Sequence, residues 1–213
     1  MNELITTLVA ADEVLVTVFG RLFENEFATL DGIAMSRKTP DGLRYLDESA
    51  ALGRLLGVQD VDEPFEPADR AILALHGALY AASPEVDTVV SGLSRHLQAL
   101  LLEGMALPAP TSMMQKRGIP DLGPHVVAPG ALLGPRQAES IAMAQELADR
   151  NGMKHLLLIG PKGFVVAAGT GAWEVMAHWH NVEFAARVEC LRVEETDVLA
   201  AGALQHGEGP GYV

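Results

Sequence analysis

Histidine and lysine side chains are the groups in this sequence best suited to move protons or to polarise a carbonyl. His76 stands in an apolar stretch, with Ile72 four residues before it and Tyr80 four residues after it, so a helix would place all three on one face. An unperturbed imidazole titrates near neutral pH, which makes His76 the best candidate for a general acid or base. The alternative is a hydrogen-bonded histidine of the core, since its neighbours are apolar.

Lys162 is the second candidate, one of four lysines in a chain that has eleven arginines. It stands between Pro161 and Gly163, in a segment that predicts a turn between two strands. An ammonium group can stabilise an enolate or a carboxylate, and a desolvated lysine can form a Schiff base with a carbonyl. The alternative is a solvated lysine on the surface of the turn.

The remaining residues give little support to a metal or nucleotide site. His178 and His180 are two residues apart, so on a helix they point about 200° away from each other and cannot converge on one ion. Their helix is expected to bury a stripe composed of Trp173, Met176, Trp179, Val182 and Ala186. Cys190 is the single cysteine, which excludes a cysteine-built metal site, and no glycine-rich nucleotide motif follows a strand.

The elements that must position these residues follow from the apolar spacing. Helices are expected over residues 2–24, 67–82, 94–102, 135–150 and 172–192. Strands are expected over 86–90, 125–128, 155–159 and 164–168, with a hairpin around Pro40-Asp41-Gly42. Because strands and helices interleave, we predict a single three-layer α/β domain with a central mixed sheet, followed by a flexible glycine-rich tail over about 203–213.

Composition excludes several classes of partner. The chain has 213 residues and a formal net charge of −13, which argues against nucleic acid and against an anionic membrane surface. The first apolar run is interrupted by Asp12 and Glu13, unlike a signal peptide, and no stretch approaches the length of a membrane span. We therefore expect a cytoplasmic protein that acts on a small molecule.

Two segments resemble the class II aldolase/adducin family. Residues 74–100 read ALHGALYAASPEVDTVVSGLSRHLQAL, and 155–188 read HLLLIGPKGFVVAAGTGAWEVMAHWHNVEFAARV. The family has a helix ending in His-x-x-Ile-Tyr, a Pro-Asp-Val turn, a strand and His-Thr-His-Ser, then later a strand, Asn-His-Gly, a strand and a long helix. A fainter match covers residues 28–42. The positions in step with the first pattern are His76, Tyr80, Pro84-Glu85-Val86, Val89-Val90 and Ser94.

Departures from the family pattern bear on the function. Enzymes of this family bind a divalent metal through three histidines, and the resemblance places these positions on Ser91, Leu93 and Lys162. The family's acidic residue falls on Ile72 and the asparagine of its phosphate-binding loop on Gly32. Leucine and a protonated lysine cannot be zinc ligands. The resemblance thus implies a member without the metal centre, with no cofactor, whose substrate is not a sugar phosphate.

The first functional hypothesis is a metal-independent lyase or cyclase acting on a small oxo acid or carbonyl compound, in a specialised biosynthetic pathway. By resemblance, Lys162 takes the place of the metal beside an enolate-like intermediate, His76 moves protons and Ser91 binds substrate as part of the catalytic set. The reaction would be C–C cleavage, decarboxylation, or condensation with cyclisation. The candidate substrate-binding residues are Ser94, Arg95, Tyr80 and Tyr212.

Two other hypotheses remain open. One is a non-catalytic binding or scaffold domain with the same fold, favoured by the joint loss of the three histidines and the acid. The other is a rebuilt metal site that uses His76, His125 or His206. The family usually forms tetramers with sites between subunits, so the resemblance also implies a homo-oligomer.

Overall fold

The computed structural model describes residues 8–9, 13–24, 33–40, 42–47, 70–103, 137–150, 155–160 and 163–206. A six-stranded sheet forms its centre, in the order β1-β3-β2-β4-β6-β5. Neighbouring strands are antiparallel except β1 and β3, which are parallel, so the sheet is mixed as predicted. The strands are β1 (Leu8–Val9), β2 (Ala34–Thr39), β3 (Gly42–Asp47), β4 (Thr88–Leu93), β5 (Leu156–Ile159) and β6 (Phe164–Gly169).

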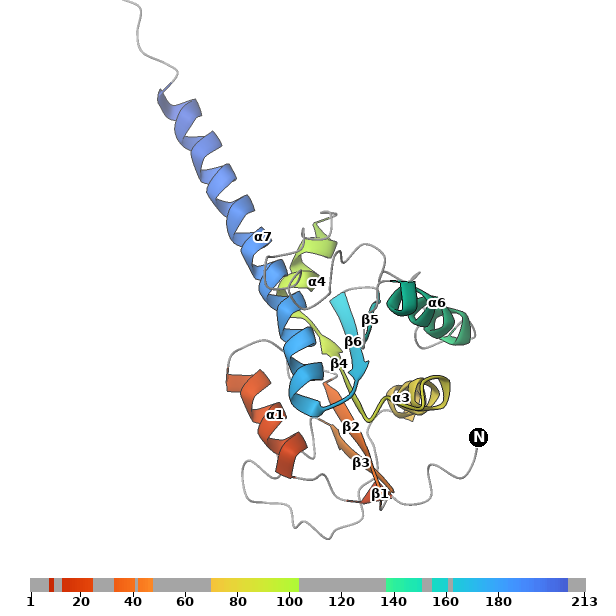
Figure 1. Cartoon of the computed structure of the whole chain (residues 1–213). Coiled ribbons are helices and arrows are strands. Elements are labelled where there is room, and N and C mark those ends of the chain that lie inside the picture. The colour runs from red at the N-terminus through yellow and green to blue at the C-terminus, as the bar shows by residue number, and fades with distance from the viewer. Residues whose placement is uncertain are drawn as a thin grey trace, which may run out of the picture.

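Helices cover both faces of this sheet (Figure 1). Helices α1, α4 and α7 pack their apolar residues against one face, and α3 and α6 pack against the other. The arrangement confirms the predicted three-layer α/β architecture. The helices are α1 (Glu13–Glu24), α3 (Arg70–Ala82), α4 (Arg95–Leu102), α6 (Gln137–Arg150) and α7 (Ala172–His206).

The face covered by α7 shows how helical periodicity builds the core. The buried stripe of α7 has members three and four residues apart, the spacing that keeps side chains on one face. Trp179 is fully buried in this stripe, whereas Trp173 is 48% exposed, so the predicted stripe was wrong at its first member. The cause is a one-residue offset, which rotates a side chain by about 100° around the helix. The stripe comprises Ala172, Val175, Trp179, Val182 and Ala186.

Strand β4 lies in the middle of the sheet, hydrogen-bonded to β2 on one side and to β6 on the other. Val90 belongs to the core beneath α7, and Val89 belongs to the core beneath α3. Because side chains alternate along a strand, Ser91 faces the same side as Val89, towards α3.

The bounds of several elements differ from those predicted. Residues 8–9 form a strand rather than the start of the first helix, and β4 extends to Leu93. Helix α7 continues to His206, so residues 203–206 of the predicted flexible tail are helical. Good helix formers surround Gly202 and offset the cost of one glycine, about 1 kcal/mol. The strand predicted over 125–128 lies outside the described residues.

Long helices in this fold do not resemble membrane spans. Within the described part of the chain, no helix is both long and apolar enough to cross a bilayer. The 35 residues of α7 include a polar face, and Figure 1 shows the helix running past α4 and away from the sheet.

Truncating the buried tryptophan of α7 tests this description of the core. We expect Trp179→Ala to lower the free energy of unfolding by about 3–5 kcal/mol, because it removes a large, fully buried side chain. Arg187→Ala is the matched control, at an exposed position of the same helix, and should change stability by less than about 0.5 kcal/mol. Urea unfolding measures both values. Equal losses in the two variants would contradict the assigned faces of α7.

Candidate functional site

His76 lies between α3 and the sheet, with both ring nitrogens hydrogen-bonded. Its Nδ1 is 2.8 Å from the Ser36 hydroxyl oxygen on β2, and its Nε2 is 2.8 Å from the Ser91 hydroxyl oxygen on β4. The Ser36 hydroxyl is also 2.8 Å from the Tyr80 hydroxyl, one helical turn after His76. All four side chains are buried, and His76, Ser36 and Ser91 are 0% exposed.

The hydrogen bonds of this network are complete for a neutral imidazole. With the ring proton on Nε2, Tyr80 donates to Ser36, Ser36 donates to Nδ1 of His76, and Nε2–H donates to Ser91, whose hydroxyl donates to the Ala34 carbonyl at 3.4 Å. With the proton on Nδ1 the order reverses: Nδ1–H donates to Ser36, Ser36 donates to Tyr80, and Tyr80 donates to the Asp87 carbonyl at 3.4 Å, while Ser91 donates to Nε2. Both tautomers of the neutral ring satisfy its two nitrogens.

Burial changes the ionisation of both titratable groups in the network. Desolvation lowers the pKa of His76 from 6.5 to about 3, so the ring is neutral throughout the physiological range. Desolvation also raises the pKa of the Tyr80 hydroxyl above its ordinary value, against the opposing effect of its hydrogen bond with Ser36. Both groups therefore stay uncharged between α3 and the sheet.

The structure thus brings together three of the residues predicted for the site: His76, Ser91 and Tyr80. Ser91 lies within β4, two residues before its end, and not at the end of the strand where the sequence suggested it. The hydrogen bonds of all three are made to protein groups in the interior. This geometry matches the alternative interpretation of His76, a hydrogen-bonded histidine of the core, and their catalytic or binding roles stay predictions.

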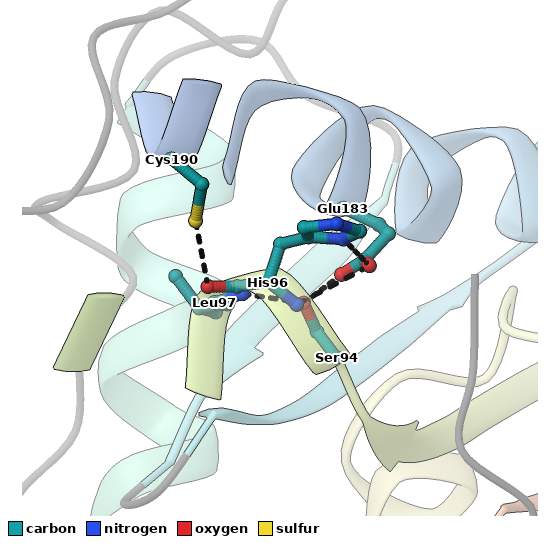
Figure 2. A network of polar contacts seen from close by, with 5 residues as sticks. All are labelled: Ser94, His96, Leu97, Glu183 and Cys190. Carbon is teal, nitrogen blue, oxygen red and sulfur yellow. Dashed lines mark hydrogen bonds and ion pairs between the residues drawn. The ribbon is translucent and has the colours of Figure 1, made fainter. Parts of the chain in front are cut away.

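A second polar cluster lies where β4 passes into α4, around the buried carboxylate of Glu183 on α7 (Figure 2). The Ser94 hydroxyl donates to one carboxylate oxygen. The other oxygen is 2.5 Å from Nδ1 of His96 and accepts the His96 backbone N–H at 3.3 Å. Ser94 is also the N-cap of α4, and its hydroxyl oxygen accepts the Leu97 backbone N–H.

Sequence reasoning missed Glu183 and did not include His96 among the candidate residues. A charged residue within the apolar stripe of α7 was the available signal, because Val182 and Ala186 beside it are buried. Of the predicted binding residues here, Ser94 is buried with its hydroxyl engaged by Glu183, and Arg95 is exposed.

The turn between β5 and β6 is joined to the same corner. The Ser94 backbone N–H donates to the Gly163 carbonyl at 2.9 Å. Gly163 has φ +76°, and a Cβ there would lie 2.6 Å from the Gln98 backbone nitrogen, so this close approach requires glycine. Lys162 precedes Gly163 in the sequence, but Lys162 lies outside the described residues, as does Tyr212.

The positions that the resemblance assigns to a divalent metal do not fit one where the structure describes them. The Ser91 hydroxyl is hydrogen-bonded to His76, and Leu93 has no donor atom. Among the described residues, no group of three His, Cys, Asp or Glu side chains is arranged to hold a metal ion. His125 lies outside these residues, and nothing is described of the His206 side chain.

His178 meets another histidine instead of His180. Its ring centroid is 4.3 Å from that of His155 at the start of β5, and both rings are almost buried. Nε2 of His155 is 3.4 Å from the exposed carboxylate of Glu174. His180 contacts the Phe184 ring, so the two histidines of α7 diverge as their spacing predicted.

Buried His76 predicts a specific dependence of stability on pH. Unfolded protein takes up a proton at this imidazole below pH 6.5, whereas the folded state does so only near pH 3, so stability falls as the pH is lowered between these values. From pH 7 to pH 5 the loss is about 2 kcal/mol. The free energy of unfolding of His76→Gln, measured in urea, should not show this part of the decrease between pH 7 and pH 5.

Ser91→Ala is the control, because it removes one hydrogen-bond partner and keeps the imidazole. Ser91→Ala should be less stable than the unmodified protein at pH 7. Between pH 7 and pH 5 it should still lose about 2 kcal/mol of unfolding free energy through the His76 imidazole. If His76→Gln and the unmodified protein lose the same stability over this range, the ring is not held neutral.

Comparison with solved structures places this architecture among known folds. No protein-family model and no curated protein matches the sequence. The putative aldolase/epimerase/decarboxylase YgbL from Klebsiella pneumoniae is 22% identical, with a TM-score of 0.56 over 83% of this chain and 86% of that one. L-fuculose-1-phosphate aldolase from Thermus thermophilus is 16% identical, with a TM-score of 0.54 over 92% and 96%. An aldolase II superfamily protein from Pseudomonas syringae is 15% identical, with a TM-score of 0.56 over 93% and 85%.

These likenesses extend over most of both chains at low sequence identity. They agree with the order of strands and helices on which the resemblance was based. The chain therefore has the fold of the class II aldolases.

Proposed function

We propose that this protein is a lyase-type enzyme that acts on a small oxo acid or carbonyl compound without a divalent metal. The reaction is C–C cleavage, decarboxylation, or condensation with cyclisation, and it passes through an enolate-like intermediate. Lys162 supplies the positive charge beside the enolate oxygen. Solved structures with this fold include an aldolase and a putative aldolase/epimerase/decarboxylase, which supports this reaction class.

One observation carries the proposal: Gly163, the residue after Lys162, is hydrogen-bonded to the start of α4. The Ser94 N–H to Gly163 carbonyl bond, together with the close contact between Gly163 and Gln98, holds the start of β6 against the corner that contains Glu183. The polar groups at this corner come from the β4–α4 junction, α4 and α7, and Gly163 is the residue that follows Lys162 in the sequence. Such convergence at a strand end is typical of sites in α/β proteins.

Metal independence is supported by the chemistry of the residues that replace the ligands. The Ser91 hydroxyl is hydrogen-bonded to His76, and the Leu93 side chain has no atom that can bind a metal ion. Carbonyl chemistry through an enolate still needs a positive centre, and an ammonium group can provide one. This requirement is the reason for assigning the role to Lys162.

A non-catalytic binding domain is the second candidate, and one observation favours it. His76 and Ser91, which the resemblance places in the active site, are 0% exposed and hydrogen-bonded to each other. In a chain that no longer performs the reaction, we expect former active-site positions to become part of the packed interior. An assay of turnover separates the two candidates.

Turnover of small oxo acids by metal-free protein tests the proposal. We would measure the metal content of the protein, dialyse it against EDTA, and assay 4-hydroxy-2-oxo acids and 3-oxo acids for released pyruvate or carbon dioxide. Turnover should survive chelation, and Lys162→Met should lower kcat/KM by about 10²-fold or more, the usual effect of losing an oxyanion-stabilising group. Lys38→Met, which changes an exposed lysine of β2, is the matched control and should leave the rate unchanged.

Two results would contradict parts of this proposal. Loss of turnover on chelation, with recovery on adding zinc or manganese, would show that a metal is required. Absence of turnover with every compound, together with no ligand-induced rise in melting temperature, would favour the non-catalytic domain.

We also propose that the protein is a homo-oligomer. In this assembly, an apolar face of α7 on one copy is covered by another copy. Large apolar side chains stand exposed on this helix at spacings that place them along one side, and exposed apolar patches of this kind often mark interfaces. They are Trp173, Phe184, Val188 and Leu191, between 43% and 52% exposed.

Charge substitution on this face tests the oligomer. Val188→Glu combined with Leu191→Glu should shift the sedimentation coefficient towards that of a monomer, because the interface would bury unpaired carboxylates. Both side chains are exposed, so the melting temperature of the isolated chain should change little. An unchanged sedimentation profile would place the interface elsewhere or show a monomer.

A further inference from the structure

Glu183 is a buried acidic residue that the proposed chemistry has not yet used. Its side chain is 0% exposed, and both oxygens accept hydrogen bonds at the start of α4. A buried carboxylate is costly unless donors surround it, and here it has the Ser94 hydroxyl, the His96 backbone N–H and the His96 ring. The positive end of the α4 dipole adds to this stabilisation.

The same contacts determine which nitrogen of His96 carries the proton. Nδ1 lies 2.5 Å from a carboxylate oxygen of Glu183, so Nδ1 is the donor and the neutral ring keeps its lone pair on Nε2. Within the described part of the chain, Nε2 of His96 has no hydrogen-bond partner. The side chain of His96 is 28% exposed, in contrast to the fully buried His76.

A carboxylate on one imidazole nitrogen prepares the other for proton transfer. It holds the tautomer and the orientation of the ring, and it stabilises the imidazolium that forms when Nε2 takes a proton. Figure 2 shows the Glu183 carboxylate reaching from α7 to His96 and Ser94, with Cys190 on the other side of the backbone of His96. The Cys190 thiol donates to the His96 backbone carbonyl at 3.6 Å.

We propose that His96 is the proton-transfer group of this protein, with Glu183 as its positioning residue. The inference rests on the proposed function, because it assigns the proton transfers of that reaction. Nε2 of His96 takes the proton of the substrate hydroxyl, and the C–C bond breaks with its electron pair passing to the enolate. The imidazolium then returns this proton to the enolate carbon, so no proton is gained or lost overall.

The location of His96 agrees with this role. Ser94, which donates to Glu183 through its side chain, also donates to Gly163 through its backbone N–H. Ser94 is therefore a common contact of the Glu183 cluster and of Gly163, the residue after Lys162. His76 cannot serve in the same way in this conformation, since both of its nitrogens are hydrogen-bonded in the interior.

Hydrogen–deuterium exchange at carbon tests the proton-transfer step directly. Pyruvate and 2-oxobutyrate in deuterium oxide would be followed by proton NMR for loss of the C3 hydrogens, with the full-length protein as catalyst. His96→Gln should slow exchange by about 10²-fold or more, the usual contribution of a general base. Glu183→Gln keeps the shape and removes the charge, so it should slow exchange by about tenfold or more with unchanged affinity for pyruvate.

Two further measurements separate this role from that of a structural cap. Nitrogen-15 NMR of the unmodified protein should show the neutral His96 ring protonated on Nδ1. Cys190→Ala, which removes a thiol hydrogen bond to the backbone carbonyl of His96, should exchange at the unmodified rate. Melting temperatures of the three variants identify any loss that comes from unfolding.

The outcomes distinguish failure of this inference from failure of the proposed function. If the unmodified protein catalyses exchange and His96→Gln does so equally fast, His96 is not the proton-transfer group, although the proposed function stands. A His96 ring protonated on Nε2 would also overturn the inference. If the unmodified protein neither exchanges the C3 hydrogens nor turns over any compound of the oxo-acid assay, the proposed function fails and the role of His96 fails with it.

Discussion

Strand β4 must pair with β2 and β6 in one register, because side chains on both of its faces complete the interior. Ser91 lies opposite Ala34 of β2 and Val166 of β6. A slip of one residue would turn Ser91 away from α3 and leave Val90 or Gly92, neither of which has a polar side chain, beside His76. Each buried polar group left without a partner costs about 1–3 kcal/mol. The His76 network therefore selects the register of β4 as well as stabilising the contact between α3 and the sheet.

His76 and His96 illustrate how environment decides what an imidazole can do. His76 has hydroxyl partners on both nitrogens and a pKa near 3, so it neither gains a proton at neutral pH nor reaches solvent. His96 has a carboxylate on one nitrogen and is partly exposed. The two imidazoles are chemically identical, so their different behaviour comes from their hydrogen-bond partners and from the extent of their burial.

Sequence periodicity was sufficient for much of the fold. The hairpin between β2 and β3, helices α3 and α4, and strands β5 and β6 follow from apolar spacing and turn residues within short windows. The resemblance and the i±4 spacing also brought His76 and Tyr80 to one face of α3 correctly. Their burial did not follow, because Ser36 comes from a strand 40 residues earlier in the sequence.

The second cluster was beyond local reasoning for the same physical reason. Ser94 and Glu183 are 89 residues apart, and they meet because α7 packs beside α4 on one face of the sheet. The extent of α7 was also underestimated. Its apolar periodicity weakens after Arg192, although the residues that follow remain good helix formers.

The two tryptophans of the chain stand on α7 six residues apart, in opposite surroundings. Trp179 is enclosed by the core, while Trp173 is half exposed. The fluorescence of the chain therefore comes from one buried and one solvent-exposed indole on the same helix. In the isolated chain a water-soluble quencher reaches Trp173 and spares Trp179, so coverage of the outer face of α7 by another copy can be observed separately from changes beneath the helix.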